Sequence, residues 1–220
     1  MLFRVGLEIL ILLLPALVLS LCVHEYAHGV VAYYYGDDTA ERHGRLTLNP
    51  MKHLDPIGTL MLLTIGFGYA KPVPVNPYNL NNPRLDMIKV AAAGPISNLI
   101  LSFIGLFLIY VFKIFFPILL NQNVYTFLEI FIQINIFLAI FNLIPVYPLD
   151  GGQIFGNIIS KYNPSFSQQL NYYGPRVLFG IITFSLISGI SLIGGILYPI
   201  SNVIRSIFEI ILNVIFYLFI

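Results

Sequence analysis

Long runs of apolar residues alternate with short polar segments along this chain. A helix needs about 20 apolar residues to cross a bilayer. Five runs reach about that length, and they predict spans over residues 7–35, 87–112, 124–143, 177–198 and 199–220. The last two runs meet at Tyr198-Pro199, where we expect a tight turn because proline cannot easily continue a helix.

Two shorter segments lie between the first and second predicted spans. The apolar run 57–67 is too short to span and contains Gly58 and Gly66, so we expect it to be re-entrant or interfacial. Residues 69–75 carry prolines that disfavour a helix, and they predict an edge strand or an extended loop. The predicted fold class is an all-α polytopic membrane protein, with about five transmembrane helices and a short re-entrant or β element after the first.

The composition agrees with this fold class. Charged residues make up 10% of the chain and hydrophobic residues 58%, and the mean hydropathy is +0.86. In soluble domains roughly a quarter of all residues are charged, so the sequence predicts an integral membrane protein. The net charge is +1 and no basic block is present, so no nucleic-acid partner is indicated. The single cysteine excludes an internal disulfide and a thiolate zinc cluster.

Lysine and arginine residues are distributed unevenly between the two predicted sides of the membrane. Placing the N-terminus outside gives eight cations on the cytoplasmic side and three on the other, which satisfies the positive-inside rule. The eight are Arg42, Arg45, Lys52, Lys71, Arg84, Lys89, Lys161 and Arg176, and the three are Arg4, Lys113 and Arg205.

The stretch HEYAH, residues 24–28, places ionisable groups inside the first apolar run. His24 and His28 are four residues apart, so on a helix they share one face and can hold one metal ion. Glu25 is rotated off that face but still reaches a water molecule at the metal, which suits zinc-dependent hydrolysis. The alternative is a polar patch that packs helices together. Ionisable groups inside a membrane are costly and are usually functional, which favours the zinc site.

A catalytic zinc site takes a third protein ligand and leaves the fourth position to water. Asp150 is the strongest candidate, because Pro145 and Pro148 break the helix before it and Gly151-Gly152 allow close backbone approach after it. The other acids in the apolar runs are expected to be isolated near helix ends and to reach the interface by snorkelling. They are Glu8, Glu129 and Glu209.

Taken together, HEYAH, GPISN at 94–98 and NLIPVYPLDGG from Asn142 resemble the signature motifs of the site-2 protease family of intramembrane zinc metalloproteases. The stretches GRLTLNPMKHLDPIGTL at 44–60 and FGYAKPVPVNP at 67–77 resemble its small bacterial and archaeal subgroup. The resemblance covers about residues 15–160 in the right order. It implies a single intramembrane metalloprotease domain over 1–220, with its core at 15–160 and C-terminal helices at 177–220.

The resemblance also implies the chemistry. One Zn²⁺ ion would be held by His24, His28 and Asp150, with Glu25 as general base and later as proton donor to the leaving amine. Asn142 would bind substrate or stabilise the oxyanion, the alternative being a hydrogen bond between helices. Residues 68–75 resemble a β element that pairs with an unwound substrate, the alternative being a plain hairpin.

The resemblance further implies partners and a location. The substrates would be transmembrane proteins cleaved near the cytoplasmic side of a prokaryotic cell membrane. The protein would lie in the lipid bilayer as a multi-pass protein, and nothing in the sequence indicates its oligomeric state.

Two other functions share these features: a non-catalytic membrane-protein binder of the same fold and a metal-ion transporter. A binder would be expected to lose Glu25 or a ligand, and transport needs no glutamate directly after the first histidine.

Five further polar residues are interpreted more plainly. His43 and His53 lie in a polar loop beside acids, and we expect ordinary hydrogen bonds there rather than a second metal site. Asn98 is interpreted as a packing or helix-start residue. Gln133 and Asn135 lie in the middle of a span and are expected to join helices.

Overall fold

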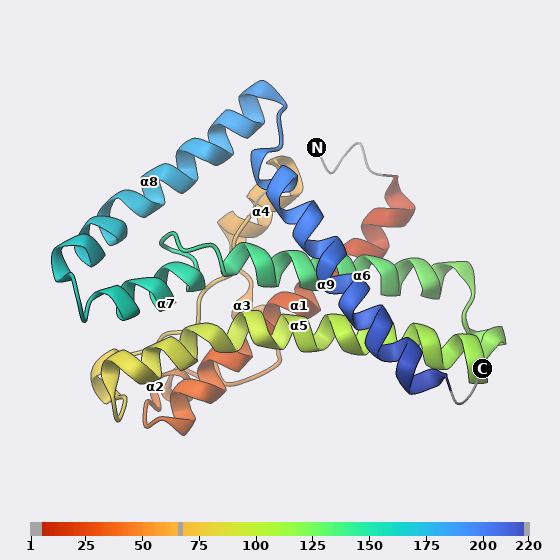
Figure 1. Ribbon diagram of the computed structural model, residues 1–220, viewed down its shortest axis with the longest axis horizontal. Coiled ribbons are helices and arrows are strands. Elements are labelled where there is room, and N and C mark those ends of the chain that lie inside the picture. The colour runs from red at the N-terminus through yellow and green to blue at the C-terminus, as the bar shows by residue number, and fades with distance from the viewer. Residues whose placement is uncertain (1–5, 66–67, 218–220) are drawn as a thin grey trace.

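The protein is a bundle of long helices, shown in Figure 1 as a computed structural model that describes residues 6–65 and 68–217. Four of these helices, α1, α5, α6 and α9, are long and apolar enough to cross a membrane. The predicted all-α polytopic membrane fold is therefore confirmed. In chain order the helices are α1 (Leu7–Tyr34), α2 (Thr39–Arg42), α3 (Pro50–His53), α4 (Pro56–Ile65), η2 (Pro77–Asn79), α5 (Pro83–Phe115), η3 (Pro117–Leu119), α6 (Gln122–Asn142), α7 (Asp150–Ile159), α8 (Pro164–Ser188) and α9 (Leu192–Phe216).

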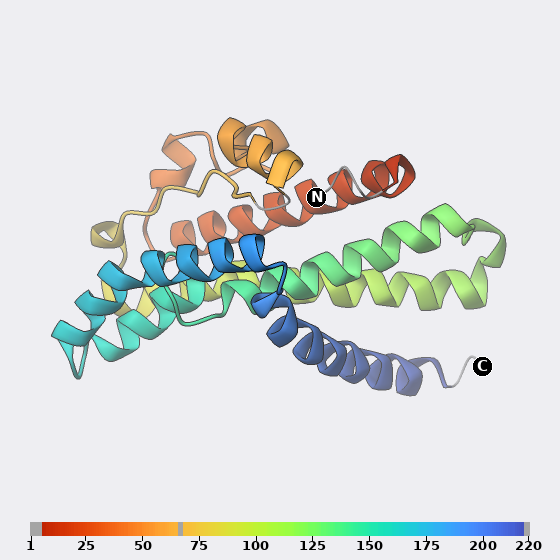
Figure 2. The same cartoon turned by 90° about the horizontal axis from the view of Figure 1, so that it is seen from above.

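Helices α1, α5 and α6 form the centre of the bundle. The antiparallel pair α5 and α6 is joined by the turn that contains η3, and α1 packs against both (Figure 2). Asn82 and Asn121 cap the starts of α5 and α6 by accepting hydrogen bonds from Leu85 N and Val124 N. The C-terminal ends of α1 and α6 and the N-terminal end of α5 consequently lie at one end of the bundle (Figure 2).

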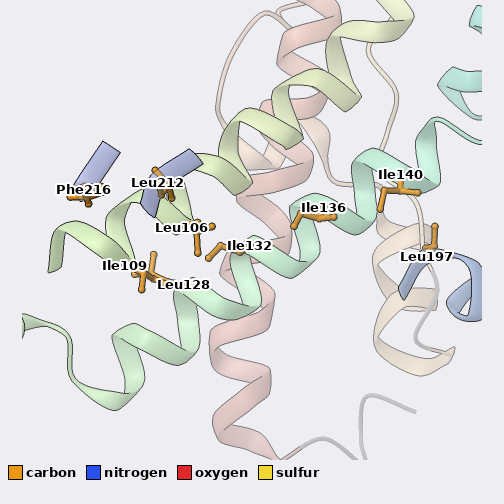
Figure 3. Packing of buried hydrophobic residues seen from close by; sticks show 9 residues of the cluster. All are labelled: Leu106, Ile109, Leu128, Ile132, Ile136, Ile140, Leu197, Leu212 and Phe216. Atoms are coloured by element: carbon orange, nitrogen blue, oxygen red, sulfur yellow. The ribbon is translucent and has the colours of Figure 1, made fainter. Parts of the chain in front are cut away.

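An apolar cluster holds α9 against α5 and α6 (Figure 3). The side chains from α6 recur every four residues and so form one stripe along that helix. Gly105 lets α5 come close, since a Cβ there would lie 2.9 Å from Ile132 Cγ1. Close packing of this kind, rather than burial from water, is what joins helices in lipid. The cluster consists of Leu106, Ile109, Leu128, Ile132, Ile136, Ile140, Leu197, Leu212 and Phe216.

The turn predicted at Tyr198-Pro199 is wrong. The helix α8 ends at Ser188 because Gly189, with φ of 73°, adopts the left-handed conformation that terminates helices. Ser191 then caps α9 by accepting a hydrogen bond from Gly194 N, and Pro199 lies inside α9. Prolines are tolerated in membrane helices because neighbouring groups satisfy the freed backbone atoms. Four described helices therefore meet the criteria for a span, instead of about five.

The predicted re-entrant or β element is also different in detail. Residues 56–65 form the short helix α4, while Gly66, at the end of the predicted run, lies outside the described residues. Within the described ranges no strand follows α1, and one isolated antiparallel bridge joins Leu54 to Ala70. The chain beyond Ala70 is extended, but Pro72 and Pro74 lack the N–H groups that a ladder needs. The alternative of an extended loop is therefore the correct one.

The expectation that Glu129 and Glu209 are isolated is wrong as well. Arg205 of α9 lies between them, with Nη1 and Nη2 at 2.6 and 2.9 Å from the two carboxylate oxygens of Glu129 in α6. Its Nε lies 2.8 Å from Glu209 Oε1, one turn along α9. Arg205 thus sits in a helix and pairs with two acids, and it is no guide to the sidedness of loops.

Candidate metal centre

Three buried side chains meet between α1 and the start of α7. The Nε2 atoms of His24 and His28 are 3.1 Å apart. Asp150 Oδ2 lies 3.2 Å from Nε2 of His24, and its Oδ1 lies 3.4 Å from Nε2 of His28. All three residues are buried. The structure therefore brings together the residues that the sequence predicts as metal ligands.

The local sequence explains how Asp150 reaches the histidines. Helix α6 ends at Asn142, the chain turns through Pro145 and Pro148, and Asp150 is the first residue of α7. The turn folds directly onto the start of α7: a Cβ on Gly151 would lie 2.2 Å from Leu143 O. Glycine is therefore required after Asp150, as its position in the sequence predicts.

Gly94 of α5 provides the space for the two imidazole rings. A Cβ at this position would lie 2.5 Å from both His24 Cε1 and His28 Nε2. Backbone atoms of α5 therefore form one wall of the site, and any side chain there would displace both rings. The GPISN stretch thus contributes to the site through its first residue.

The outer nitrogens of both rings have partners that orient them. His28 Nδ1 lies 2.7 Å from Val90 O, and His24 Nδ1 lies 2.6 Å from Asn98 Oδ1. A carbonyl oxygen only accepts, so each Nδ1 carries the proton of a neutral ring. The Nε2 atoms are then left as lone-pair acceptors that face each other and the carboxylate.

This arrangement fits a bound cation. Two imidazole lone pairs and a carboxylate converge, and no donor of the described residues forms a hydrogen bond with the buried Oδ2 of Asp150. Acceptors this close repel one another unless a proton or a metal ion lies among them. Two histidines and one aspartate are a ligand set that zinc takes in hydrolytic enzymes. The residues present therefore fit zinc.

Glu25 lies beside this group rather than in it. Its carboxylate is buried, and its Oε2 accepts a hydrogen bond of 2.8 Å from the backbone N–H of Val73. Within the described part of the chain, no group donates to the other oxygen, Oε1. One oxygen is thus held by the loop and the other is available as a proton acceptor.

The loop that carries Val73 is fixed by Asp37, which is fully buried just after α1. The Asp37 carboxylate accepts hydrogen bonds from Thr39, from the backbone N–H of Asn76 and from the side chain of Asn79. Burial raises the pKa of Asp37, but these hydrogen bonds outweigh burial and hold the pKa below its usual value. Asp37 was not predicted as a site residue, because one aspartate in an acidic loop carries no motif.

Asn142 does not join the cluster in this structure. It is half-buried at the end of α6, and its amide donates a 3.0 Å hydrogen bond to Leu138 O of the same helix. Among the described residues, none of the three converging side chains is hydrogen-bonded to it. The side-chain amide of Asn142 is therefore bound to its own helix α6 and not to the three candidate ligands.

Asn98 is the site residue that the sequence interpretation missed. It is fully buried and contacts His24, so its role goes beyond packing or helix initiation. A signal was present, since Asn98 follows Gly94 by four residues and so lies on the same face of α5. The expectation for Gln133 and Asn135 is confirmed: Gln133 donates to Ser201 of α9, and Asn135 joins α6 to α1 and α5.

His43 and His53 make ordinary hydrogen bonds, as expected. His43 Nδ1 bonds Thr39 O at 2.8 Å, and His53 Nε2 bonds Thr47 O at 2.7 Å. In the chain as described, neither belongs to a group of three potential metal ligands.

Comparison with known proteins gives a consistent family. The profile of Peptidase family M50 matches residues 12–116 and 112–185. "Putative zinc metalloprotease YwhC" of Bacillus subtilis is 42% identical over 201 residues, 88% of this chain and 89% of that protein. "Putative zinc metalloprotease Rip2" of Mycolicibacterium smegmatis is 30% identical over 167 residues, which cover 74% of this chain and 61% of that protein. "Zinc metalloprotease MJ0392" of Methanocaldococcus jannaschii is 32% identical over 145 residues, which cover 66% of this chain and 33% of that protein. No solved structure matches this chain.

Proposed function

The chain belongs to peptidase family M50, and on this premise we propose that it is an intramembrane endopeptidase that cleaves other membrane proteins within or near their transmembrane segments. That it is a zinc metalloprotease and an integral membrane protein follows from its family, its relatives and its apolar helices. The proposal concerns the substrate, the residues that act on it and the side of the membrane on which they act.

The observation that carries the proposal is the depth of the metal centre. His24 and His28 lie within a helix long enough to span, and His28 precedes the end of that helix by six residues. At 1.5 Å per residue this is about 9 Å, so the site lies below the end of the span by roughly two turns. A protease that acted only on soluble chains would have no use for a site at this depth.

We assign zinc to His24, His28 and Asp150, and proton transfer to Glu25. Zinc held by these three residues would polarise the scissile carbonyl and make the attacking water more acidic. Glu25 Oε1 accepts a proton from that water while the water oxygen forms a bond to the carbonyl carbon. The same carboxyl group then returns the proton to the amine nitrogen as the C–N bond breaks. The hydrogen bond from Val73 N–H to Oε2 restrains the carboxylate and leaves Oε1 for this proton transfer.

Asn142 is proposed to stabilise the oxyanion. A neutral amide donor suits charge that develops where water is scarce. In this structure the amide donates to Leu138 O, so the role requires that bond to be exchanged for one to the substrate.

The extended segment 71–76 is proposed to contact the unwound substrate, since it adjoins Glu25 through Val73. Its prolines and internal hydrogen bonds limit how a strand can be added. Within 71–76 as described, Val75 is the residue whose N–H has no partner. We therefore propose that a substrate strand donates to carbonyls of this segment more than it accepts from its amides.

The orientation proposed places the metal centre near the cytoplasmic side of a prokaryotic cell membrane. The end of the bundle that holds the metal centre also holds the loops between α1 and α5, with Arg42, Arg45, Lys52 and Lys71. The turn between α5 and α6 at the other end adjoins Lys113. This excess of cations supports a cytoplasmic site.

A reconstituted cleavage assay tests the proposal. Proteoliposomes carry the wild type, Glu25→Gln or Glu8→Gln together with a transmembrane substrate, and a soluble peptide of the same cleavage sequence is assayed in parallel. Glu8 is a matched control, because it is an exposed acid on the same helix. We expect the wild type and Glu8→Gln to cleave the transmembrane substrate and Glu25→Gln to lose about 1,000-fold in rate. Cleavage of the soluble peptide alone, or full activity of Glu25→Gln, would contradict the proposal.

A further inference from the structure

A chain of neutral polar side chains runs through the middle of the bundle to the metal centre. It consists of Ser20 of α1, Asn98 of α5 and Asn135 of α6, none of which has exposed surface. Each makes a hydrogen bond to another member, so the chain joins all three central helices. Polar groups this deeply buried in a membrane protein are costly unless each is satisfied, and here they are.

The hydrogen bonds between Ser20 and Asn135 allow only one assignment of donor and acceptor. Ser20 Oγ donates to Ala16 O at 2.7 Å, so its lone pairs face away from that carbonyl. Asn135 Nδ2 donates to Ser20 Oγ and to Phe131 O, both at 2.8 Å. A carbonyl oxygen cannot donate, so the nitrogen of the Asn135 amide must face Phe131 and its oxygen must face Asn98.

The hydrogen bonds of Asn98 continue the chain in the same donor-to-acceptor direction. Asn98 Nδ2 donates to Asn135 Oδ1 at 2.8 Å and to Ser20 O at 3.3 Å. The Asn98 amide therefore cannot be flipped, and its Oδ1 points to His24 Nδ1 at 2.6 Å. An oxygen at this position accepts, so the proton of a neutral His24 ring belongs on Nδ1 and the lone pair on Nε2.

We propose that Asn98 and, through it, Asn135 are positioning residues that fix the tautomer and the ring orientation of His24 for zinc binding. This inference rests on the proposed assignment of His24 as a zinc ligand. The two histidines differ in this respect: His28 is oriented by the backbone carbonyl of Val90, which no substitution removes, whereas His24 depends on two side chains. Partners of this kind typically contribute 10–100-fold to metal affinity.

The test measures zinc affinity by competition with a chelator, using the full chain in detergent and no substrate. The variants are Asn98→Leu, Asn135→Leu, His24→Ala and Gln133→Leu. Gln133 is the matched control, because it lies in α6 two residues from Asn135 but bonds to Ser201 of α9. We expect the zinc dissociation constant to rise about 30-fold in Asn98→Leu and about 10-fold in Asn135→Leu. It should stay within about threefold of the wild type in Gln133→Leu.

Nitrogen NMR of ¹⁵N-histidine in the zinc-free protein provides the second measurement. We expect His24, assigned by its absence from the spectrum of His24→Ala, to be the Nδ1–H tautomer in the wild type and a mixture in Asn98→Leu. Asn135→Leu leaves the Asn98 side chain in place but removes the acceptor that orients it, so it should show a smaller admixture of the second tautomer. This variant keeps the proposal testable if Asn98→Leu does not fold.

The outcomes separate the two proposals. Unchanged zinc affinity in His24→Ala would overturn the ligand assignment on which the proposed function depends. Loss of zinc in His24→Ala with wild-type affinity and tautomer in Asn98→Leu and Asn135→Leu would overturn the positioning role alone. An equal loss in Gln133→Leu would also overturn it, because the effect would then follow from helix packing in general.

Discussion

Two groups of polar side chains lie inside the membrane-spanning helices, and they differ in charge, burial and the helices that they join. Ser20, Asn98 and Asn135 are neutral and fully buried, and their hydrogen bonds lead to His24. The ionic cluster of Arg205 with Glu129 and Glu209 is charged and about a quarter to two fifths exposed, and it ties α9 to α6.

The difference shows what each kind of interaction is suited to. A neutral amide chain has a fixed donor-to-acceptor direction and buries no net charge, so it can set the proton position on a ring in a fully enclosed site. An arginine bidentate to a carboxylate is stronger but needs partial exposure to offset desolvation. We therefore expect variants of the two groups to separate, with zinc affinity changing in one and stability in the other.

The largest effect is expected at Gly94, on the metal side of this comparison. A methyl group in Gly94→Ala would overlap both imidazole rings, so zinc affinity should fall by more than about 100-fold, beyond the usual loss for outer partners of metal ligands. Chelator competition in detergent measures this.

Gly105→Ala is the control, because it lies on the same helix and crowds the ends of Ile132 and Phe131 instead of the histidines. It should lower stability and leave zinc affinity unchanged. Wild-type zinc affinity in Gly94→Ala would show that the rings bind no metal in the observed positions.

The next effect concerns the ionic cluster. Arg205→Leu leaves two carboxylates without their cation, so the free energy of unfolding should fall by about 2 kcal/mol. Equilibrium unfolding in mixed micelles measures it, and zinc affinity should be unaffected. The triple variant Arg205→Leu/Glu129→Gln/Glu209→Gln removes the unpaired charges and should regain part of the loss. A drop in zinc affinity as large as the drop in stability would break the proposed separation.

The smallest effect concerns Asp37, a buried charge outside the spans. Because the pKa of Asp37 is lower in the folded than in the unfolded chain, its ionised form contributes stability above the usual aspartate pKa of about 3.9. That contribution should be lost as the pH falls through the folded-state pKa. Asp37→Asn cannot accept from both Thr39 and Asn76 N–H, so it should be less stable by about 1 kcal/mol at neutral pH.

Thermal unfolding of the wild type and of Asp37→Asn between pH 7 and pH 3 provides the measurement. The difference in stability between the two proteins should become smaller as the pH falls. A difference that stays constant over this range would mean that Asp37 is not ionised in the folded protein.

Much of the candidate site follows from local sequence. The four-residue spacing of His24 and His28 predicts a shared helix face, and prolines before Asp150 predict the broken helix that carries it. Such features depend on backbone rules that act within a few residues. The same local rules explain the misplaced turn between α8 and α9. The prediction placed it at Pro199, whereas Gly189 ends α8 and Pro199 lies inside α9.

The features that the sequence did not reveal all depend on contacts between distant helices. Arg205 and Glu129 are 76 residues apart, and Asn98 and His24 are 74 apart. Neither pairing is visible until α9 and α5 are packed against their neighbours. A single asparagine or arginine in an apolar helix has many possible partners, and only the packing selects one.

The zinc affinity of Asp150→Ala, compared with that of Glu25→Gln, distinguishes a zinc ligand from a general base. Both variants remove a buried carboxylate near the imidazoles, but only Asp150 has its oxygens within 3.4 Å of both histidine Nε2 atoms. We predict that Asp150→Ala loses more than about 100-fold in zinc affinity, whereas Glu25→Gln binds zinc like the wild type and loses only catalysis. Wild-type zinc affinity in Asp150→Ala, or an equal loss in Glu25→Gln, would contradict the assignment of ligand and base.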